Sequence, residues 1–441
     1  MTERLGDGGT EAGDRAPAIA TASYPSDARL LDELREAWPP AGPATADGRG
    51  YATPDLAGRE PVAVVRLGDR YAVALVGGVE RSFDVVPLVR DEVLSTSWRR
   101  AIAGDGLSAF VAGVPVASER AIDADQTNTS VVVGERAIVK WFRRVGPGPS
   151  RAATLIAHLD AVGFEAIPRA LGAISWRSPS GVDLALAQGD RFLANAVDGW
   201  QWIVHRLETH VDHLPDPCPA ECDPWVGAPL GRLVRDLHGA LATPSPVIAT
   251  PRVAAQPEEI AEWRQRTRDT LADAVQLTSD GDASAGATLR ALEPGMRAAI
   301  DRLRPDRAVG AQPVHGDLHV GQVLEWPGGL AVIDFDGNPA LDPAANALRQ
   351  PVERDLAQML SSLDHVGRVV ARGRPAGAET IDRWIVRARR EFLAGAGGSP
   401  DPILVSAFEI EQECRELVYA ARFLPRWRYA PMATLRARFV S

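Results

Sequence analysis

Several features that define large protein classes are scarce or missing in this sequence. The 441 residues include 3 cysteines, too few for a disulfide framework in a chain of this length. No run of about 18 apolar residues occurs, so no segment is expected to cross a membrane. The first residues are acidic and rich in Gly and Ala, without the apolar core of a signal peptide. These absences predict a cytoplasmic protein.

Long blocks of charge of one sign are missing as well. The formal net charge is −10, and no block of like charge exceeds a few residues. We therefore expect neither nucleic acid nor an anionic membrane as a partner. Hydrophobic residues make up 45% and charged residues 24%, a composition typical of globular proteins. The length leaves room for two or three domains with a large buried core.

Two of the cysteines, Cys218 and Cys222, lie close together in the run PCPAEC. A structural zinc site needs a full set of nitrogen and sulfur ligands. We identify no second cysteine pair or histidine cluster that completes such a set. The prediction is therefore a pair of free thiols rather than a metal site.

Residues 312–337, QPVHGDLHVGQVLEWPGGLAVIDFDG, hold the densest group of candidate catalytic side chains. His315, Asp317 and Gln322 follow the spacing H-x-D-x-x-x-x-Q, and Asp334 begins the run D-F-D-G. Loop residues at strand ends often carry catalytic groups, although an ordinary hairpin with solvated acids is the alternative. Phosphoryl transfer needs this layout, because one carboxylate accepts the proton of the attacking hydroxyl. An amide oxygen and a second carboxylate then bind the Mg²⁺ of the nucleotide.

The runs HGDLH and IDFDG resemble those of the aminoglycoside-phosphotransferase-like branch of the protein-kinase fold. Gln322, where most members of that branch carry Asn, is similar to the maltokinase and glucosamine-kinase subgroup. The resemblance implies an α+β, two-lobed protein-kinase-like fold with an N-terminal cap domain. It also implies Asp317 as the catalytic base and His315 as a loop-shaping residue. Gln322 and Asp334 would then be the Mg²⁺ ligands.

The chain is predicted to comprise four parts. Residues 1–23 are expected to be disordered, and residues 24–95 to form the cap domain. Residues 96–190 are assigned to the kinase N-lobe with its hinge, and residues 191–441 to a mostly helical C-lobe with the catalytic loops and the substrate site. Within the cap, the pattern predicts one helix and three strands, at residues 27–38, 61–67, 70–76 and 81–86.

The N-lobe is expected to contact ATP through three residues. Apolar runs at residues 130–133 and 137–142 predict a hairpin, and Lys140 in its second strand is placed to reach nucleotide phosphates. The resemblance adds Ser130, at the end of the polar run QTNTS. A buried strand at residues 184–188 is expected to end at the hinge, where backbone groups near Gln188 would contact adenine. The helix that follows the hairpin, about residues 150–161, lacks the glutamate that pairs with the equivalent of Lys140 in kinases.

Helical periodicity dominates the C-lobe. Asp198 is expected to cap the first helix, with Trp200 packed on the lobe. His238 falls within a helical repeat and is expected to be a packed or surface residue, and Asp355 resembles the structural acid of the fold. The predicted helices before the catalytic loop cover residues 202–211, 229–241, 258–277 and 284–303.

A last long helix, residues 402–424, carries an acidic stripe. On a helical wheel Glu409, Glu413 and Glu416 lie beside an apolar stripe that should pack on the lobe. Glu411 and Arg415, at i,i+4 spacing, fall on the far side and are expected to face water. Stacked carboxylates repel one another unless a cation or hydrogen-bond donors lie among them. A solvated acidic face is the alternative.

Residues 412–435, QECRELVYAARFLPRWRYAPMATL, resemble the signature segment of bacterial glucosamine kinases. The resemblance implies ATP-dependent phosphorylation of the 6-hydroxyl of D-glucosamine, with ATP and a small amino sugar as partners and Mg²⁺ as cofactor. The ammonium group of the amino sugar would make charge-assisted hydrogen bonds with Glu409, Glu413 and Glu416, and Asp317 would also contact the sugar. Trp427 would stack on the pyranose. A maltokinase, an aminoglycoside phosphotransferase and a non-catalytic pseudokinase are the alternatives.

Overall fold

The computed structural model divides the chain into two compact units, Met1–Ala161 with Pro168–Ala194, and Val162–Ile167 with Asn195–Ser441. The predicted helix at residues 27–38, the predicted strand at residues 81–86 and most of the N-terminal stretch lie outside the described residues. The structure describes residues 20–22, 60–67, 70–76, 119–121, 129–133, 135–141, 150–177, 183–214, 216, 218–338 and 349–439.

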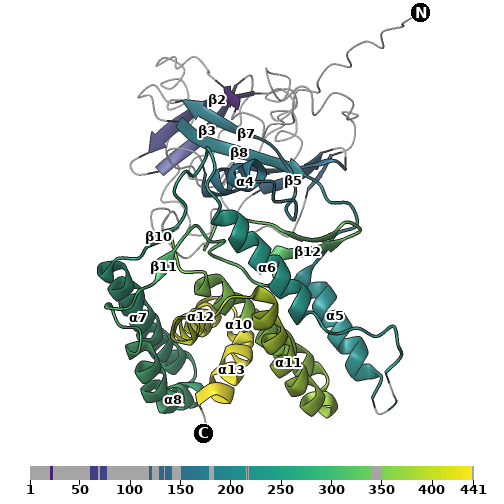
Figure 1. Cartoon of the computed structure of the whole chain (residues 1–441), viewed down its shortest axis with the longest axis vertical. Coiled ribbons are helices and arrows are strands. Elements are labelled where there is room, and N and C mark those ends of the chain that lie inside the picture. The colour runs from purple at the N-terminus through teal and green to yellow at the C-terminus, as the bar shows by residue number, and fades with distance from the viewer. Residues whose placement is uncertain are drawn as a thin grey trace, which may run out of the picture. The chain divides into compact units, whose positions relative to one another are not determined.

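The first unit contains a six-stranded sheet in the order β1-β7-β8-β6-β5-β4 and a separate hairpin, β2-β3 (Figure 1). The hairpin confirms two of the strands predicted for the cap. β5 and β6 form the predicted second hairpin, with Glu135 at φ 51° in its turn. The strands are β1 (Ala20–Ala22), β2 (Glu60–Leu67), β3 (Arg70–Val76), β4 (Glu119–Ala121), β5 (Thr129–Val133), β6 (Ala137–Trp141), β7 (Ala170–Arg177) and β8 (Asp183–Arg191), with helix α4 (Arg151–Ala161).

Strand β8 runs further than its apolar pattern predicts. Gly189 and Asp190 continue the pairing with β6 and β7, and the strand ends at Arg191. These two residues are held in the sheet, so the strand is longer than the predicted range of residues 184–188. The chain leaves the first unit for the last time after Ala194.

The second unit is mainly helical, and its predicted helices are confirmed (Figure 1). Asp198 caps the first of them as expected, since its side chain accepts a hydrogen bond from the N–H of Gln201 at 3.1 Å. The helices are α5 (Gly199–Asp212), α6 (Gly227–Leu241), α7 (Pro257–Gly281), α8 (Ala283–Asp301), α10 (Glu353–Gly373), α11 (Ala378–Ala396), α12 (Pro402–Arg422) and α13 (Tyr429–Phe439). A small sheet of β9 (Val197–Asp198), β12 (Val323–Trp326) and β13 (Gly329–Val332) carries the candidate catalytic loop, which includes residues 315–322 and Asp334.

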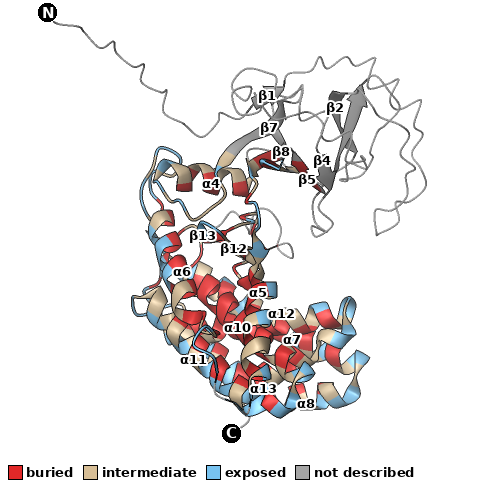
Figure 2. Ribbon diagram, turned by 90° about the vertical axis from the view of Figure 1, so that its right-hand side faces the viewer, coloured by how far each residue is buried: buried red, intermediate tan, exposed pale blue. Residues whose placement is uncertain are grey.

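Helix α10 is the central element of the second unit. It contacts α5, α11, α12 and α13, and every residue from Arg354 to Gly367 is buried (Figure 2). A helix buried on all sides is usually apolar. This one carries buried Asp355, Gln358 and Asp364, so these polar groups need partners inside the protein.

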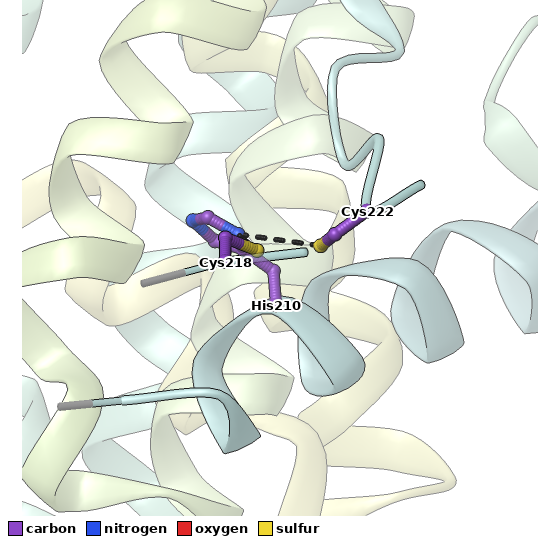
Figure 3. A group of neighbouring side chains, drawn as sticks. All are labelled: His210, Cys218 and Cys222. Carbon is purple, nitrogen blue, oxygen red and sulfur yellow. Dashed lines mark hydrogen bonds between the residues drawn. The ribbon is translucent and has the colours of Figure 1, made fainter. Parts of the chain in front are cut away.

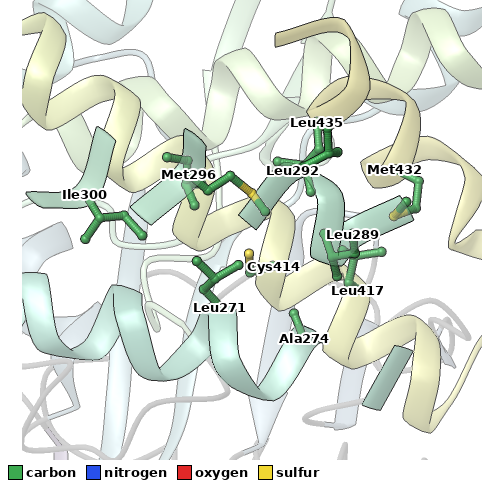
Figure 4. Close-up of a cluster of buried hydrophobic side chains, with 11 residues drawn as sticks. Leu271, Ala274, Leu289, Leu292, Met296, Ile300, Cys414, Leu417, Met432 and Leu435 are labelled. Carbon is green, nitrogen blue, oxygen red and sulfur yellow. The ribbon is translucent and has the colours of Figure 1, made fainter. Parts of the chain in front are cut away.

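Helices α7, α8, α12 and α13 enclose an apolar core (Figure 4). The apolar stripe predicted on α12 is confirmed where Ile410, Cys414 and Leu417 enter this core with no exposed surface. Burying a leucine side chain contributes about 1.5–3 kcal/mol, so this contact fixes the rotation of α12 about its axis. Among the described residues, no helix is both long and apolar enough to span a membrane.

Candidate active site

The catalytic loop is closed on itself by His315, which has no exposed surface. Its Nε2 donates to the carbonyl oxygen of Ile333 at 2.8 Å, and its Nδ1 accepts from the N–H of Asp317 at 3.3 Å. The ring also packs against Phe335, with centroids 4.9 Å apart. One imidazole therefore links the backbone of Asp317 to that of Ile333, the residue just before Asp334.

Asp355 of α10 holds the start of the same loop. Its carboxylate accepts from the N–H groups of His315 and Gly316, both at 2.8 Å, and from Nε2 of His238 at 2.9 Å. Burial alone would raise the pKa of Asp355, but the hydrogen bonds from His238 and the backbone lower it. The carboxylate therefore stays ionised, and its role in this geometry is structural.

Two further side chains of α10 continue this support, and neither was among the predicted site residues. Gln358 Oε1 accepts from the N–H of Leu318 at 3.0 Å, and Ser362 Oγ accepts from the N–H of Val320 at 3.1 Å. With Asp355, they are spaced three and four residues apart, so they lie on one face of the helix. That spacing marks a polar face on the helix, but it does not specify which loop this face contacts.

Asp317, the candidate base, lies half-buried in the loop supported in this way. Its Oδ1 is 3.4 Å from Nε2 of Gln358. Burial raises the pKa of Asp317, whereas the positive charges of His319 and Arg415 oppose the rise. Arg415 comes from α12, so this helix brings its charge to the catalytic loop.

Gln322 and Asp334 lie side by side. Gln322 Nε2 is 3.5 Å from Oδ2 of Asp334, and its carbonyl oxygen accepts from the N–H of Ile333 at 3.0 Å. Asp334 is exposed and has φ 65°, a conformation that Asp tolerates better than most residues. Carboxylate and amide oxygens are the donors that Mg²⁺ prefers. Amide nitrogen and oxygen can exchange places by rotation of the side chain, so these two residues fit a divalent ion.

The three acids of the α12 stripe have different partners in the structure. Glu409 is buried, with Oε1 2.7 Å from Arg389 Nη2 and Oε2 2.7 Å from Arg438 Nη1. Glu413 is also buried, and its Oε2 is 2.8 Å from Nε2 of His365. For Glu409 and Glu413, the protein itself therefore supplies the cation that was expected beside each carboxylate.

Glu416 differs from the other two acids. It is half-buried, and among the described residues its hydrogen bonds come from neutral donors. Gln412 Nε2 donates to its Oε1 at 3.0 Å, and Trp427 Nε1 donates to its Oε2 at 2.8 Å. The Trp427 ring also lies 5.9 Å from that of Trp200, which packs on the lobe as predicted. Within the stripe, Glu416 is therefore the carboxylate that these contacts leave without a cationic partner.

The expectation that Glu411 faces water is wrong. Glu411 is buried, and its carboxylate accepts from Arg266 Nε at 3.0 Å, from Thr267 Oγ1 at 3.1 Å and from Arg354 Nη1 at 3.2 Å. Both α7 and α10 pack against α12 on this side. A helical wheel gives the angle of each residue but not what lies at that angle, so the burial was not predictable from the pattern.

The pair His365–Glu413 should make stability depend on pH. Burial opposes protonation of His365, but the charge and hydrogen bond of Glu413 raise its pKa to about 9. Because this folded-state pKa exceeds the ordinary value of 6.5, the contribution is complete below pH 6.5 and is lost as pH rises through 9. We expect the unfolding free energy to fall by roughly 3 kcal/mol over this range. Urea unfolding of the wild type and of His365→Gln at pH 6.5 and pH 9 tests this prediction. It is contradicted if the unfolding free energies of the two proteins change equally between these pH values.

The three candidate ATP contacts lie next to one another in the first unit. Ser130 on β5 is paired with Lys140 on β6, which is paired in turn with Gln188 on β8. Residues directly opposite in antiparallel strands project from the same face. Gln188 Nε2 donates to the carboxylate of Asp190 at 2.9 Å, and Asp190 is a diagonal neighbour of Lys140. Asp190 was not among the predicted site residues.

The expectation that no histidine cluster lies beside the paired cysteines is wrong. His210 Nδ1 is 3.2 Å from Cys218 Sγ and 3.6 Å from Cys222 Sγ. His213 Nδ1 is 3.1 Å from Cys218 Sγ. Helix α5 ends between the two histidines, and the chain then folds back. Residues up to twelve positions apart in the sequence therefore come into contact.

Known proteins resemble this chain over most of its length. A glucosamine kinase from Streptacidiphilus jiangxiensis is 35% identical over 413 residues, covering 85% of this chain and 90% of the relative. One from Mycolicibacterium smegmatis (strain ATCC 700084 / mc(2)155) is 34% identical over 385 residues, covering 80% and 92%. A solved glucosamine kinase in complex with glucosamine, ADP and inorganic phosphate superposes with a TM-score of 0.68 at 31% identity, covering 91% of this chain and 98% of its own. No family model matches the chain.

The fold is therefore that of the protein-kinase-like, aminoglycoside-phosphotransferase-like enzymes, and the protein is a phosphotransferase with an alcohol group as acceptor. The catalytic loop, held by one face of α10, has the order of groups that this class requires. The chain belongs to the glucosamine kinase family.

Proposed function

We propose that this protein transfers the γ-phosphoryl group of ATP to the 6-hydroxyl of D-glucosamine, giving glucosamine 6-phosphate. The observation that carries the proposal is the 34–35% identity with glucosamine kinases over most of the chain. It is supported by the solved relative with glucosamine, ADP and inorganic phosphate. The choice of the 6-hydroxyl follows the family resemblance. The cytoplasm is the proposed compartment, because ATP is available there.

In this proposal Asp317 accepts the proton of the sugar hydroxyl, and its raised pKa suits a general base. Gln322 and Asp334 hold Mg²⁺, which would neutralise the phosphates of the bound nucleotide. His315 keeps Asp317 and the end of β13 at a constant separation through its two hydrogen bonds.

The proposed nucleotide contacts are Lys140, Ser130 and Gln188. Their common face, set by strand register, supports a joint role. Lys140 would act as a point charge on the phosphates, and Asp190 is the acid proposed to orient it in place of the absent helix glutamate. Gln188 Oε1 is buried and has no hydrogen-bond partner among the described residues, so a ligand donor would satisfy it.

The amine of the sugar is proposed to bind Glu416. Among the described residues, Glu416 accepts hydrogen bonds only from neutral groups, so an ammonium would add a charged donor to this carboxylate. Such a bond is stronger than one to a neutral hydroxyl. Trp427, held by its own bond to Glu416, is proposed to stack on the pyranose. Glu409 and Glu413 are proposed to support this site through Arg389 and His365.

The substrate proposal is tested by measuring ADP release from Mg-ATP with glucosamine, glucose, maltose, N-acetylglucosamine and kanamycin. Turnover with glucosamine far above the others is expected. Preference for maltose or kanamycin would support a maltokinase or an aminoglycoside phosphotransferase. No turnover with any of them would favour a pseudokinase.

The variant Glu416→Gln should raise the KM for glucosamine. The amide keeps the size of the side chain but removes the charge that pairs with the ammonium. A hydrogen bond to a charged group contributes about 1.5–3 kcal/mol, so we expect a rise of roughly 10- to 150-fold. Steady-state kinetics should show little change in the KM for ATP, and the preference for glucosamine over glucose should narrow.

The matched control is Glu262→Gln, which removes one charge from an exposed position on α7. Its kinetic constants should equal those of the wild type. An unchanged KM for glucosamine in Glu416→Gln would place the amine elsewhere, and Glu413→Gln would then be the next variant.

A further inference from the structure

Four side chains with soft or borderline donor atoms meet where α5 ends. His210 lies in its last turn and His213 is its C-cap, while Cys218 and Cys222 belong to the segment that leads to α6. The ligand atoms of His210, Cys218 and Cys222 all lie within 4.8 Å of one another (Figure 3). His213 adjoins this group through its 3.1 Å contact with Cys218.

We propose that His210, His213, Cys218 and Cys222 bind one Zn²⁺ ion in a structural Cys₂His₂ site. Zinc in proteins takes four nitrogen and sulfur ligands in a tetrahedron, with Zn–S of about 2.3 Å and Zn–N of about 2.0 Å. These bond lengths place a nitrogen and a sulfur about 3.5 Å apart along each tetrahedral edge. Three of the four nitrogen–sulfur edges of such a site are defined here, at 3.1, 3.2 and 3.6 Å. The Nδ1 atom of His213 lies beside Cys218 but outside the group of ligand atoms that are all within 4.8 Å of one another, so the His213 side chain would turn towards the ion on binding.

The donor atoms select the kind of ion. Thiolate and imidazole favour zinc, whereas Mg²⁺, the ion of the nucleotide, is bound by oxygen. The site is therefore distinct from the pair Gln322–Asp334 in both position and chemistry. Cys218 is exposed and Cys222 half-buried, so an ion can enter from solvent.

The ion would fix the connection between α5 and α6. Trp225 of this connection packs edge-on against His210 at 5.8 Å and lies under the guanidinium of Arg387 at 3.6 Å. Trp384 Nε1 donates to the carbonyl oxygen of Pro224 at 2.7 Å. The connection is thus already held on α11, and the metal would hold its other end to α5. Metal bound only by the folded chain adds to its stability.

The experiment uses full-length protein without a histidine tag, purified without chelator. Elemental analysis should find about one zinc per chain in the wild type. It should find none in the double variant Cys218→Ser/Cys222→Ser. The variant His205→Gln, an exposed histidine on the same helix, should keep its zinc.

Two further measurements separate a built site from adventitious binding. Co²⁺ in place of zinc should give the visible absorption of tetrahedral coordination together with a sulfur-to-metal charge-transfer band. A chelator should lower the Tm of the wild type by several degrees but leave that of the double variant unchanged. His213→Gln should weaken zinc binding at least tenfold while His205→Gln does not.

The proposal fails if wild type and double variant contain equally little zinc and bind added zinc equally weakly. It fails also if mass spectrometry of the metal-free wild type shows a Cys218–Cys222 disulfide that persists when zinc is supplied under reducing conditions. Zinc present in wild type but retained by His213→Gln at full affinity would remove His213 from the ligand set and overturn the four-ligand assignment.

Discussion

Replacing Asp317 with asparagine is expected to lower kcat about 10²- to 10⁴-fold, the usual contribution of a general base. Asparagine keeps the size of the side chain and an oxygen for Gln358, but it cannot accept the hydroxyl proton. Mg-ATP binding should persist, because the proposed metal ligands are Gln322 and Asp334. Steady-state kinetics with glucosamine and calorimetric titration with Mg-ATP measure the two effects separately.

The control for charge is Asp273→Asn, at an exposed position on α7, which should match the wild type in both assays. Thermal unfolding of Asp317→Asn should show that the loop is intact. Turnover within a few-fold of wild type would mean that Asp317 is not the base. Activity should also decline as pH falls towards the pKa of Asp317, which burial raises, because the base must be ionised.

Replacing Glu411 with alanine is expected to reduce the unfolding free energy by about 3–5 kcal/mol, as when one partner of a buried ion pair is removed. Arg354, itself buried, would keep its charge without this carboxylate. Burial opposes ionisation of Glu411, but Arg354 and Arg266 lower its pKa to about 2. The ionised pair therefore stabilises the fold above pH 4.5, and this contribution is lost as pH falls towards 2.

Urea unfolding measures this effect as a lower midpoint at unchanged slope. Glu262→Ala, at an exposed position on α7, should change stability by no more than about 0.5 kcal/mol. The double variant Glu411→Met/Arg354→Met should recover part of the loss, because it removes the unpaired buried charge. A loss below about 1 kcal/mol for Glu411→Ala would mean that water reaches Arg354 in the folded protein.

Local patterns predicted the secondary structure well where a single period or cap decides it. The helix cap at Asp198 and the apolar stripe at Ile410 and Leu417 follow from short-range rules, and both are confirmed. The order of His315, Asp317, Gln322 and Asp334 pointed to phosphoryl transfer because those groups lie within one loop. The kinetics of Asp317→Asn test the proposed role of the base in this loop.

Contacts between distant segments were not predictable in the same way. The sequence placed Glu409, Glu413 and Glu416 in one stripe, but Arg389 and His365 on other helices neutralise the first two. The support of the catalytic loop by Gln358 and Ser362 likewise joins groups about 40 residues apart. Nothing in the local pattern specifies which helix face meets which.

By itself, the sequence determined the class of chemistry, the order of the candidate catalytic groups and the helices of the second unit. Each depends on neighbours along the chain or on one helical repeat. Only the tertiary structure decided which acids are neutralised, which one is left to neutral donors, and that two histidines join two cysteines. Charge and ligand geometry are set by distances through space, and only the packed fold brings those groups within bonding reach.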